Sequence, residues 1–270
     1  AQQVIAKIES REGVRNIEAI FHAADGVMVA RGDMGVELPP EEVPHVQKKL
    51  IALGNRLGKP VITATHMLDS MARNPRPTRA EVTDVANAIF DGSDAVMLSG
   101  ETALGRYPVE TVRMMDRIAR KTEEALDYAA LLERRRARTG RVTVADAIAR
   151  ATCETAADLN VKAILCSTQS GSTARKLSMY RPKAPIVAAT PNERVFRQLC
   201  LAWGVRPVLT PRTTQIDAMI DGLIAAAKRI GFVSDGDLVA IAAGVRTGTP
   251  GSTNLLQIQV VGEEARRSYF

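Results

Sequence analysis

The chain has 270 residues, a formal net charge of +6, 46% hydrophobic residues and 24% charged residues. This composition excludes a disordered, collagen-like or coiled-coil chain, and the length allows one large domain or two of ordinary size. No apolar run approaches the roughly 20 residues that cross a bilayer. Charged residues interrupt the first dozen positions, so we expect neither a membrane partner nor a signal peptide.

The spacing of the cysteines and of the basic residues indicates the cellular compartment and the kind of ligand. Cys153, Cys166 and Cys200 lie far apart without a CxxC pair, which favours a reducing, cytoplasmic location. The basic residues are spread out and rarely interleaved with aromatic residues. We therefore expect no nucleic acid partner and favour small phosphorylated ligands.

The first 126 residues repeat one pattern, a short aliphatic run followed by a turn and an amphipathic stretch of helix length. Strands are expected at 4–8, 26–30, 61–65 and 95–98, and helices at 15–24, 41–57, 79–90 and 108–126. Strands and helices that alternate in this way predict an α/β fold with a parallel sheet, as in a (β/α) barrel.

A basic stretch at 131–140 follows, which we interpret as a helix end and a connector between domains. A second series begins with a helix at 144–159 and continues with strands at 163–166, 186–189, 205–209, 238–242 and 255–261. Eight strands would suit a single (β/α)8 barrel, but the connector and the ninth strand favour two domains. Because half a barrel leaves two open edges, the first block is either part of one irregular barrel or the tail of a barrel that begins earlier.

Polar side chains gather where the first two strands end. Lys7 and Glu9 are two residues apart and thus point to the same side of the first strand, and Asp33 follows the second strand. Glu9 and Asp33 are candidates to share a Mg²⁺ ion, although both also suit ordinary salt bridges. A lysine that faces a barrel interior requires anions or a ligand to neutralise it.

The next two strands also end in polar residues, Thr65 and His66 after the third and Ser99 and Glu101 after the fourth. Barrel enzymes keep their chemistry at this rim. Together the four strand ends predict an active site, with His66 more simply a hydrogen-bonded wall residue than a base.

In the second block, a hydroxyl-rich loop connects a strand to a helix expected from Ala174. Such a loop offers backbone amides and a positive helix end to a phosphate, although an N-cap without a ligand has the same pattern. A second glycine-containing loop at 246–253 is a candidate to close over that ligand. The candidate effector-binding residues are Ser167, Thr168, Ser170, Gly171, Ser172 and Thr173.

Five segments, at 5–9, 28–37, 59–71, 74–88 and 97–102, resemble the pyruvate kinase family. The likeness is dense over residues 1–120 and looser, but continuous, to the end. It implies that residues 1–126 are the C-terminal part of a catalytic (β/α)8 TIM barrel. Residues 140–270 are then a separate α/β domain with a mostly parallel sheet, for allosteric control and oligomerisation.

The resemblance also implies an activity, the transfer of the phosphoryl group of phosphoenolpyruvate to ADP, which gives pyruvate and ATP with Mg²⁺ and K⁺. Glu9 and Asp33 would ligate Mg²⁺, and Lys7 would stabilise the phosphoryl group. Backbone amides of Gly32 and Asp33 would hold the substrate carboxylate, with Thr65 beside the enolate carbon. Ser99 and Glu101 would support a proton relay.

Further implications concern assembly and completeness. The family is usually a homotetramer with a phosphorylated allosteric effector. The resemblance places the N-terminal barrel strands, a lid domain and the K⁺ ligands before residue 1, so we do not expect these 270 residues alone to catalyse the reaction. His66 stands where the family leads us to expect glutamine.

Two other readings stay open. A shortened protein would serve as a non-catalytic effector-binding or subunit-interaction module. Mg²⁺-dependent lyases also pair a glutamate and an aspartate on adjacent barrel strands.

Overall fold

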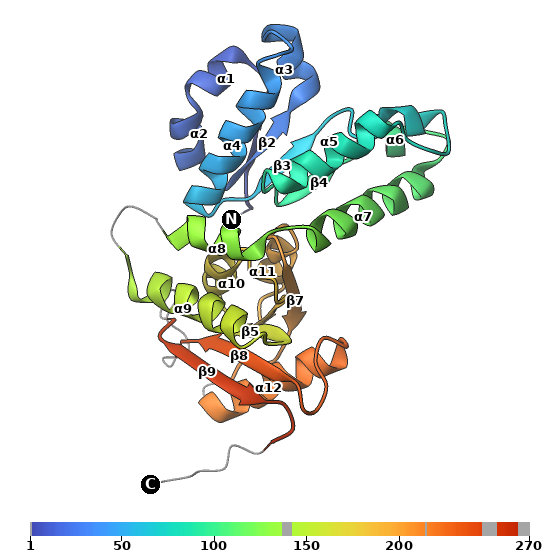
Figure 1. Cartoon of the computed structure of the whole chain (residues 1–270). Helices are drawn as coiled ribbons and strands as arrows, with labels where there is room; N and C mark the ends of the chain where they lie inside the picture. The colour runs from blue at the N-terminus through green and yellow to red at the C-terminus, as the bar shows by residue number, and fades with distance from the viewer. Residues whose placement is uncertain (1, 137–141, 214, 245–252, 264–270) are drawn as a thin grey trace. The chain divides into compact units, whose positions relative to one another are not determined.

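The computed structural model describes residues 2–136, 142–213, 215–244 and 253–263. The chain divides into two compact units, Ala1–Leu126 and Asp127–Phe270, which we call the N-terminal and C-terminal units (Figure 1). No helix within these described ranges is both long and apolar enough to cross a membrane.

The N-terminal unit contains a sheet of four parallel strands in the order β1-β2-β3-β4. The predicted strands are confirmed, each within one residue at either end. The strands are β1 (Ile5–Ile8), β2 (Gly26–Ala30), β3 (Val61–Ala64) and β4 (Ala95–Met97). The helical segments are α1 (Arg11–Arg15), α2 (Ile17–Ala23), α3 (Arg31–Glu37), α4 (Val43–Leu57), η1 (Asp69–Ala72), α5 (Arg79–Phe90), α6 (Gly100–Ala103) and α7 (Pro108–Glu124).

One face of this sheet is covered by helices. Ile8, Val27 and Val61 point to that face and pack with Phe21 of α2 and Leu50 of α4 in a single buried cluster. Because side chains alternate along a strand, Lys7 and its neighbours in register point to the opposite face. Parallel strands with helices on one side form part of the wall of a (β/α) barrel, which confirms the predicted fold class.

Local sequence signals explain two of the helix ends in this unit. Gly58 ends α4 in the left-handed conformation with φ of 68°, which glycine adopts without steric cost. Thr78 begins α5 with a capping box, in which the Thr78 side chain accepts from the amide of Glu81 and the Glu81 side chain accepts from the amide of Thr78.

Two helices differ from the prediction. The helix expected at 15–24 is two helices, because the Ser10 side chain caps the backbone amide of Gly13 and starts α1 early, and Asn16 lies between α1 and α2 outside the helical region. The segment after β2, where we predicted no helix, forms the short helix α3. The sequence did not predict this helix because it contains two glycines, which have low helix propensity.

The C-terminal unit contains a five-stranded sheet in the order β7-β6-β5-β8-β9, in which only β9 is antiparallel to its neighbour. The mostly parallel sheet was predicted. Its strands are β5 (Ala163–Ser167), β6 (Ile186–Thr190), β7 (Val205–Leu209), β8 (Leu238–Ala243) and β9 (Leu255–Val260). Its helices are α8 (Tyr128–Arg136), α9 (Val144–Asp158), α10 (Ser172–Met179), α11 (Glu193–Leu199) and α12 (Ile216–Arg229).

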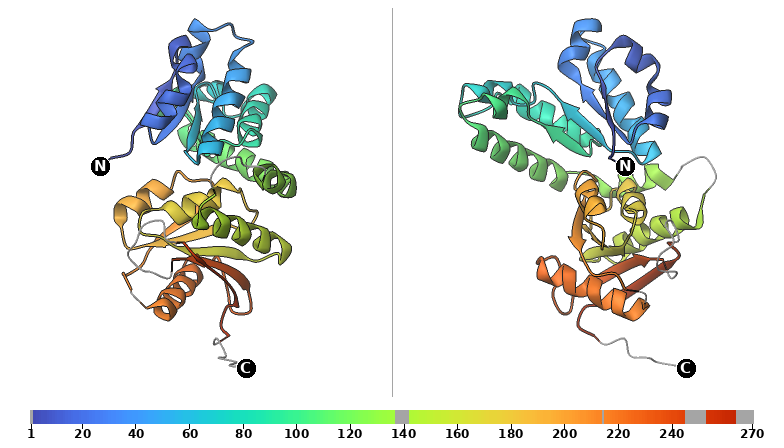
Figure 2. Two further views of the ribbon diagram at one scale, coloured as in Figure 1. Left: turned by 90° about the vertical axis from the view of Figure 1, so that its left-hand side faces the viewer. Right: turned by 180° about the vertical axis from the view of Figure 1, so that it is seen from behind.

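This unit has three layers. Ile164 and Cys166 of β5 point into a core shared with α9, α10 and α11, whereas Leu165 points into a second core against α12. Figure 2 shows α12 on the opposite face of the sheet from α9. The sheet is therefore buried on both faces, as is usual for parallel strands.

The basic stretch after residue 126 forms helix α8. Leu132 packs against the first of the two cores, and the Arg135 guanidinium donates to the backbone carbonyl of Met179. This helix therefore belongs to the C-terminal unit. The rest of the predicted connector, residues 137–140, lies outside the described ranges.

Candidate active site

The carboxyl ends of the four parallel strands in the N-terminal unit bring the first set of predicted residues together. The ammonium nitrogen of Lys7 lies 2.5 Å from Glu9 Oε2 and 2.9 Å from Asp33 Oδ2. Lys7 and Glu9 come from the end of β1, and Asp33 lies in the first turn of α3. One cation thus joins carboxylates that are 24 residues apart in the sequence. The alternation of side chains predicted that Lys7 and Glu9 would lie on the same side of the strand.

These charges stabilise one another. Hydrogen bonds to Glu9 and Asp33 raise the pKa of Lys7 to about 12, and the hydrogen bond from Lys7 lowers the pKa of Asp33. The lysine and Asp33 are therefore both charged at neutral pH. About half of the Lys7 side chain is exposed in this unit, so its two carboxylate partners, rather than burial, define its environment.

The carboxylates also suit a divalent cation. Glu9 and Asp33 converge on the same positive charge. Mg²⁺ in phosphoryl-transfer sites is typically held by one or two carboxylates, with substrate phosphates and water as the other ligands. The pair fits that donor set. Within the described ranges, no group of three or more His, Cys, Asp or Glu side chains forms a metal cluster.

Gly32 and Thr65 lie in close contact across the ends of β2 and β3. A Cβ atom on Gly32 would lie 2.5 Å from Thr65 Cγ2, so only glycine fits there. Thr65 and the following His66 both have left-handed backbones, with φ of 78° and 53°. This conformation is rare for a β-branched residue and strains the chain.

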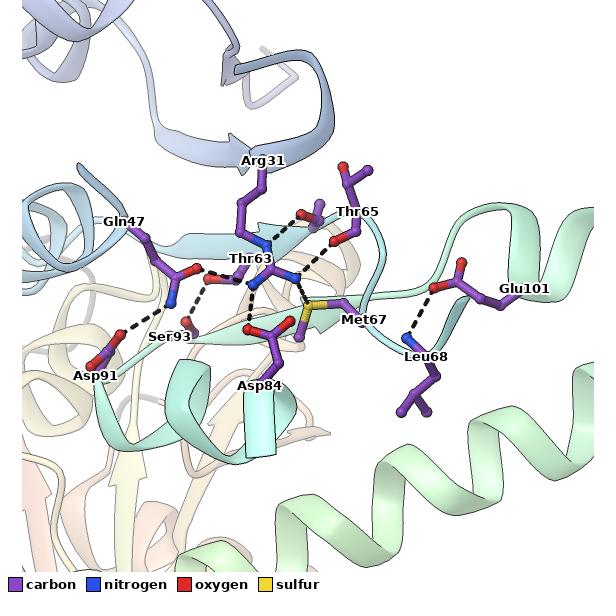
Figure 3. Close-up of polar contacts among 11 residues, drawn as sticks. Arg31, Gln47, Thr63, Thr65, Met67, Leu68, Asp84, Asp91, Ser93 and Glu101 are labelled. Atoms are coloured by element: carbon purple, nitrogen blue, oxygen red, sulfur yellow. Dashed lines mark hydrogen bonds and ion pairs between the residues drawn. The ribbon is translucent and has the colours of Figure 1, made fainter. Parts of the chain in front are cut away.

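The guanidinium of Arg31 lies beside this strained turn (Figure 3). Arg31 donates to the backbone carbonyls of Ala64 at 3.2 Å and Thr65 at 2.7 Å. It also donates to Asp84 of α5 at 2.6 Å and to Gln47 of α4 at 3.3 Å. The side chain of Arg31 is only 13% exposed.

Glu101, a predicted proton-relay residue, accepts hydrogen bonds from two backbone amides. Its carboxylate accepts from the amide of Leu68 at 3.2 Å and from the amide of Ser99 at 2.7 Å. The residue is buried. Ser99 accepts through its carbonyl from the amides of Thr102 and Ala103, so its backbone is fixed at the end of β4.

Comparisons with known proteins show the family of this chain. Residues 1–112 match the model for the barrel domain of pyruvate kinase, and residues 146–259 match the model for its alpha/beta domain. The chain belongs to the pyruvate kinase family. It is 57% identical to a pyruvate kinase of Geobacillus stearothermophilus over 261 residues, which are 97% of this chain and 44% of that protein. It is 53% identical to a pyruvate kinase of Clostridium acetobutylicum over 259 residues, 96% of this chain and 54% of that protein.

The chain thus spans about half the length of these pyruvate kinases. The two family models match the two structural units in the same order, since the barrel model lies within Ala1–Leu126 and the alpha/beta model within Asp127–Phe270.

In the alpha/beta domain of this pyruvate kinase family member, the hydroxyl-rich loop is tightly folded. Thr168 Oγ1 accepts from the amide of Gly171 at 2.9 Å, and Gly171 is left-handed with φ of 82°. Helix α10 starts at Ser172, two residues before the expected position. The Thr173 hydroxyl lies 2.7 Å from that of Thr253. Residues 246–252 of the second predicted loop lie outside the described ranges.

The sequence did not indicate a role for Arg31, Gln47 or Asp84. Arg31 and Asp84 are 53 residues apart in the sequence. One signal did exist. Gln47 is a buried polar residue on the face of α4 that also carries Leu50 and Ile51, and a buried polar side chain usually has a partner.

Proposed function

We propose that the full-length protein to which these residues belong is a pyruvate kinase. In the reaction, a terminal oxygen of ADP attacks the phosphorus of phosphoenolpyruvate, the bond from phosphorus to the enol oxygen breaks, and the enolate takes a proton at carbon to give pyruvate. The observation that carries the proposal is Lys7 in contact with both Glu9 and Asp33 at the carboxyl edge of the barrel strands. Membership of the family supports it.

The charges of the Lys7 cluster suit phosphoryl transfer. Catalysis of this reaction depends on positioning and on the neutralisation of charge on the moving group. Lys7 is held charged by its two carboxylate partners and supplies a positive charge to the phosphoryl oxygens. Mg²⁺, bound by Glu9 and Asp33, would neutralise further charge on the phosphate. K⁺ is part of the proposal as a family cofactor, with no ligand assigned among these residues.

The turn of Gly32 and Thr65 suits the organic part of the substrate. Amides in the first turn of a helix have no acceptor within it, so the amides of Gly32 and Asp33 at the start of α3 are suited to a carboxylate. Thr65 packs directly against Gly32, which supports the proposed role of Thr65 beside the enolate carbon. We retain Ser99 as a proton-relay candidate. We propose that Glu101 instead holds the loops after β3 and β4 together, because each of its carboxylate oxygens accepts a hydrogen bond from a backbone amide.

For the C-terminal unit, we propose a phosphorylated allosteric effector at the loop of Ser167, Thr168, Ser170, Gly171, Ser172 and Thr173 and a contribution to a homotetramer. The folded loop ahead of α10 supports the effector site. The free thiols of Cys153, Cys166 and Cys200 suit a reducing cytoplasm.

The test uses the polypeptide as its own gene encodes it. We expect pyruvate to form from phosphoenolpyruvate only when ADP is present, with equimolar ATP. Pyruvate formed without ADP would indicate a lyase and contradict the proposal.

A second candidate is the non-catalytic module, favoured by the separate two-sided core of the C-terminal unit. Binding of a sugar phosphate or nucleotide without turnover in the full-length polypeptide would support it over the kinase.

A further inference from the structure

We propose that Arg31 is a positioning residue that holds Thr65 in its strained, left-handed conformation against Gly32. The inference rests on the proposed function, in which Thr65 lies beside the reacting carbon. It adds a residue that touches no substrate atom and acts through the backbone of Thr65.

The contacts of Arg31 are directed at this turn. Its Nε donates to the carbonyl of Ala64, the last residue of β3, and its Nη2 donates to the carbonyl of Thr65. In Figure 3 the Thr65 carbonyl points toward Arg31 and its hydroxyl points away from Arg31. One rigid guanidinium therefore fixes two successive carbonyls at the point where the chain leaves the strand.

The guanidinium is itself held from two other elements. Nη1 donates to Asp84 of α5 and to Gln47 of α4, and Gln47 in turn donates through Nε2 to Asp91 at 3.1 Å. Planar arginine has several donors in a fixed fork. The packed helices α4 and α5 thereby set the position of the turn after β3.

The turn needs this support, because left-handed Thr65 and His66 are strained and such conformations persist only where the surroundings determine them. The Thr65 methyl lies against the site where Gly32 lacks a Cβ atom. If the Thr65 backbone relaxed to a negative φ, its side chain would lose this contact with Gly32. A shift of about 1 Å in a positioning group is enough to lower turnover by about 10²-fold.

Net charge does not explain Arg31. Asp84 neutralises it at 2.6 Å, whereas Lys7 is the cation that pairs with Glu9 and Asp33 among the described residues. Substitution of Arg31 by lysine would keep the positive charge but lose the forked set of donors. Comparison of arginine with lysine at this position therefore separates an effect of charge from an effect of hydrogen-bond geometry.

The experiment measures kcat and KM of the full-length enzyme for wild type, Arg31→Gln, Thr65→Ala and the double variant, with Arg31→Lys as the conservative variant. Arg120→Gln is the matched control, since Arg120 forms an exposed ion pair on α7. We expect Arg31→Gln to lower kcat by about 10²-fold, with KM for ADP unchanged. The double variant should be no slower than Thr65→Ala alone, because both act on one group.

The inference would be overturned if the fold-losses in kcat of the two single variants multiplied in the double variant. Full turnover in Arg31→Lys would also overturn it. If Arg31→Gln fails to fold, Asp84→Asn replaces it, with a smaller loss expected and the same lack of additivity with Thr65→Ala. Wild type without ADP-dependent turnover would refute the proposed function instead. A crystal structure then decides the inference, which fails if Thr65 in an Arg31 or Asp84 variant keeps its positive φ and its contact with Gly32.

Discussion

Glu101 accepts a hydrogen bond from the backbone amide of Leu68 at 3.2 Å and so joins the loop after β4 to the loop after β3. The other carboxylate oxygen accepts from the amide of Ser99. In Glu101→Gln one of these amides would face an NH₂ donor. We expect a loss of about 1–3 kcal/mol in the free energy of unfolding, because a buried donor is left unsatisfied.

Urea unfolding measures this cost, and the pH profile of kcat separates the two roles of Glu101. A clamp predicts lower stability with an unchanged profile. A proton relay predicts unchanged stability and a shifted profile, which would contradict our assignment.

Lys7→Met removes the positive charge that contacts both carboxylates. In the full-length enzyme we expect turnover to fall by about 10³-fold, comparable to the loss of a catalytic cation in other phosphoryl-transfer enzymes. Lys121→Met is the control, because that lysine is 83% exposed on α7 and pairs only locally with Glu124 among the described contacts. Steady-state rates of pyruvate formation test this prediction, and an undiminished rate in Lys7→Met would refute the role of Lys7.

Asp33→Asn removes one of the two proposed metal ligands. We expect the affinity of the full-length protein for Mn²⁺, used as a spectroscopic probe for Mg²⁺, to fall by at least about 10-fold. Asp69→Asn serves as the control, since Asp69 forms an exposed ion pair with Arg73. Equal Mn²⁺ affinities in wild type and Asp33→Asn would show that the metal binds elsewhere.

Asp146 makes the stability of the C-terminal unit depend on pH in the acidic range. Burial raises its pKa, but hydrogen bonds from Lys176 and Thr143 outweigh burial and lower the pKa from 3.8 to about 2. Because the pKa is lower in the folded state, the stabilisation is present above pH 4 and is lost as the pH falls toward 2. The Asp146 side chain is 20% exposed, and we expect about 1–2 kcal/mol after allowance for solvent screening.

Denaturant unfolding between pH 4 and pH 2 checks this. Wild type should lose that stability over the interval, whereas Asp146→Asn should already lack it at pH 4 and change less. Glu193→Gln, which removes an exposed ion pair with Arg197, should behave like wild type. An identical pH dependence of wild type and Asp146→Asn would exclude the role of Asp146.

The three cysteines should differ in reactivity. Burial raises the pKa of the Cys166 thiol to about 12 and raises that of Cys153 as well, whereas Cys200 is exposed. Since the thiolate is the reactive form, a thiol reagent should modify Cys200 rapidly in the native protein and the other two only after unfolding. Rapid modification of all three without denaturant would contradict the packing of β5 against α9.

Several features follow from the sequence because they depend on neighbours along the chain. The aliphatic runs predicted every strand of both sheets, and the two-residue spacing of Lys7 and Glu9 placed them on one side of β1, where they contact the same cation. The parallel order then predicted that Asp33 would join them. The short helix α3 escaped prediction, because its glycines have low helix propensity and its packing against α4 comes from the tertiary fold.

The support of Thr65 was decided only by the tertiary structure. Nothing in the local sequence indicates that Thr65 is left-handed, because a β-branched residue avoids that conformation. It is held there by Arg31, which Asp84 and Gln47 hold in turn from two helices distant in sequence. Periodicity records which side of an element a residue occupies, whereas the partner of a buried guanidinium depends on how whole elements pack. The sequence therefore determined the strands and the family, and only packing determined which side chains position the site.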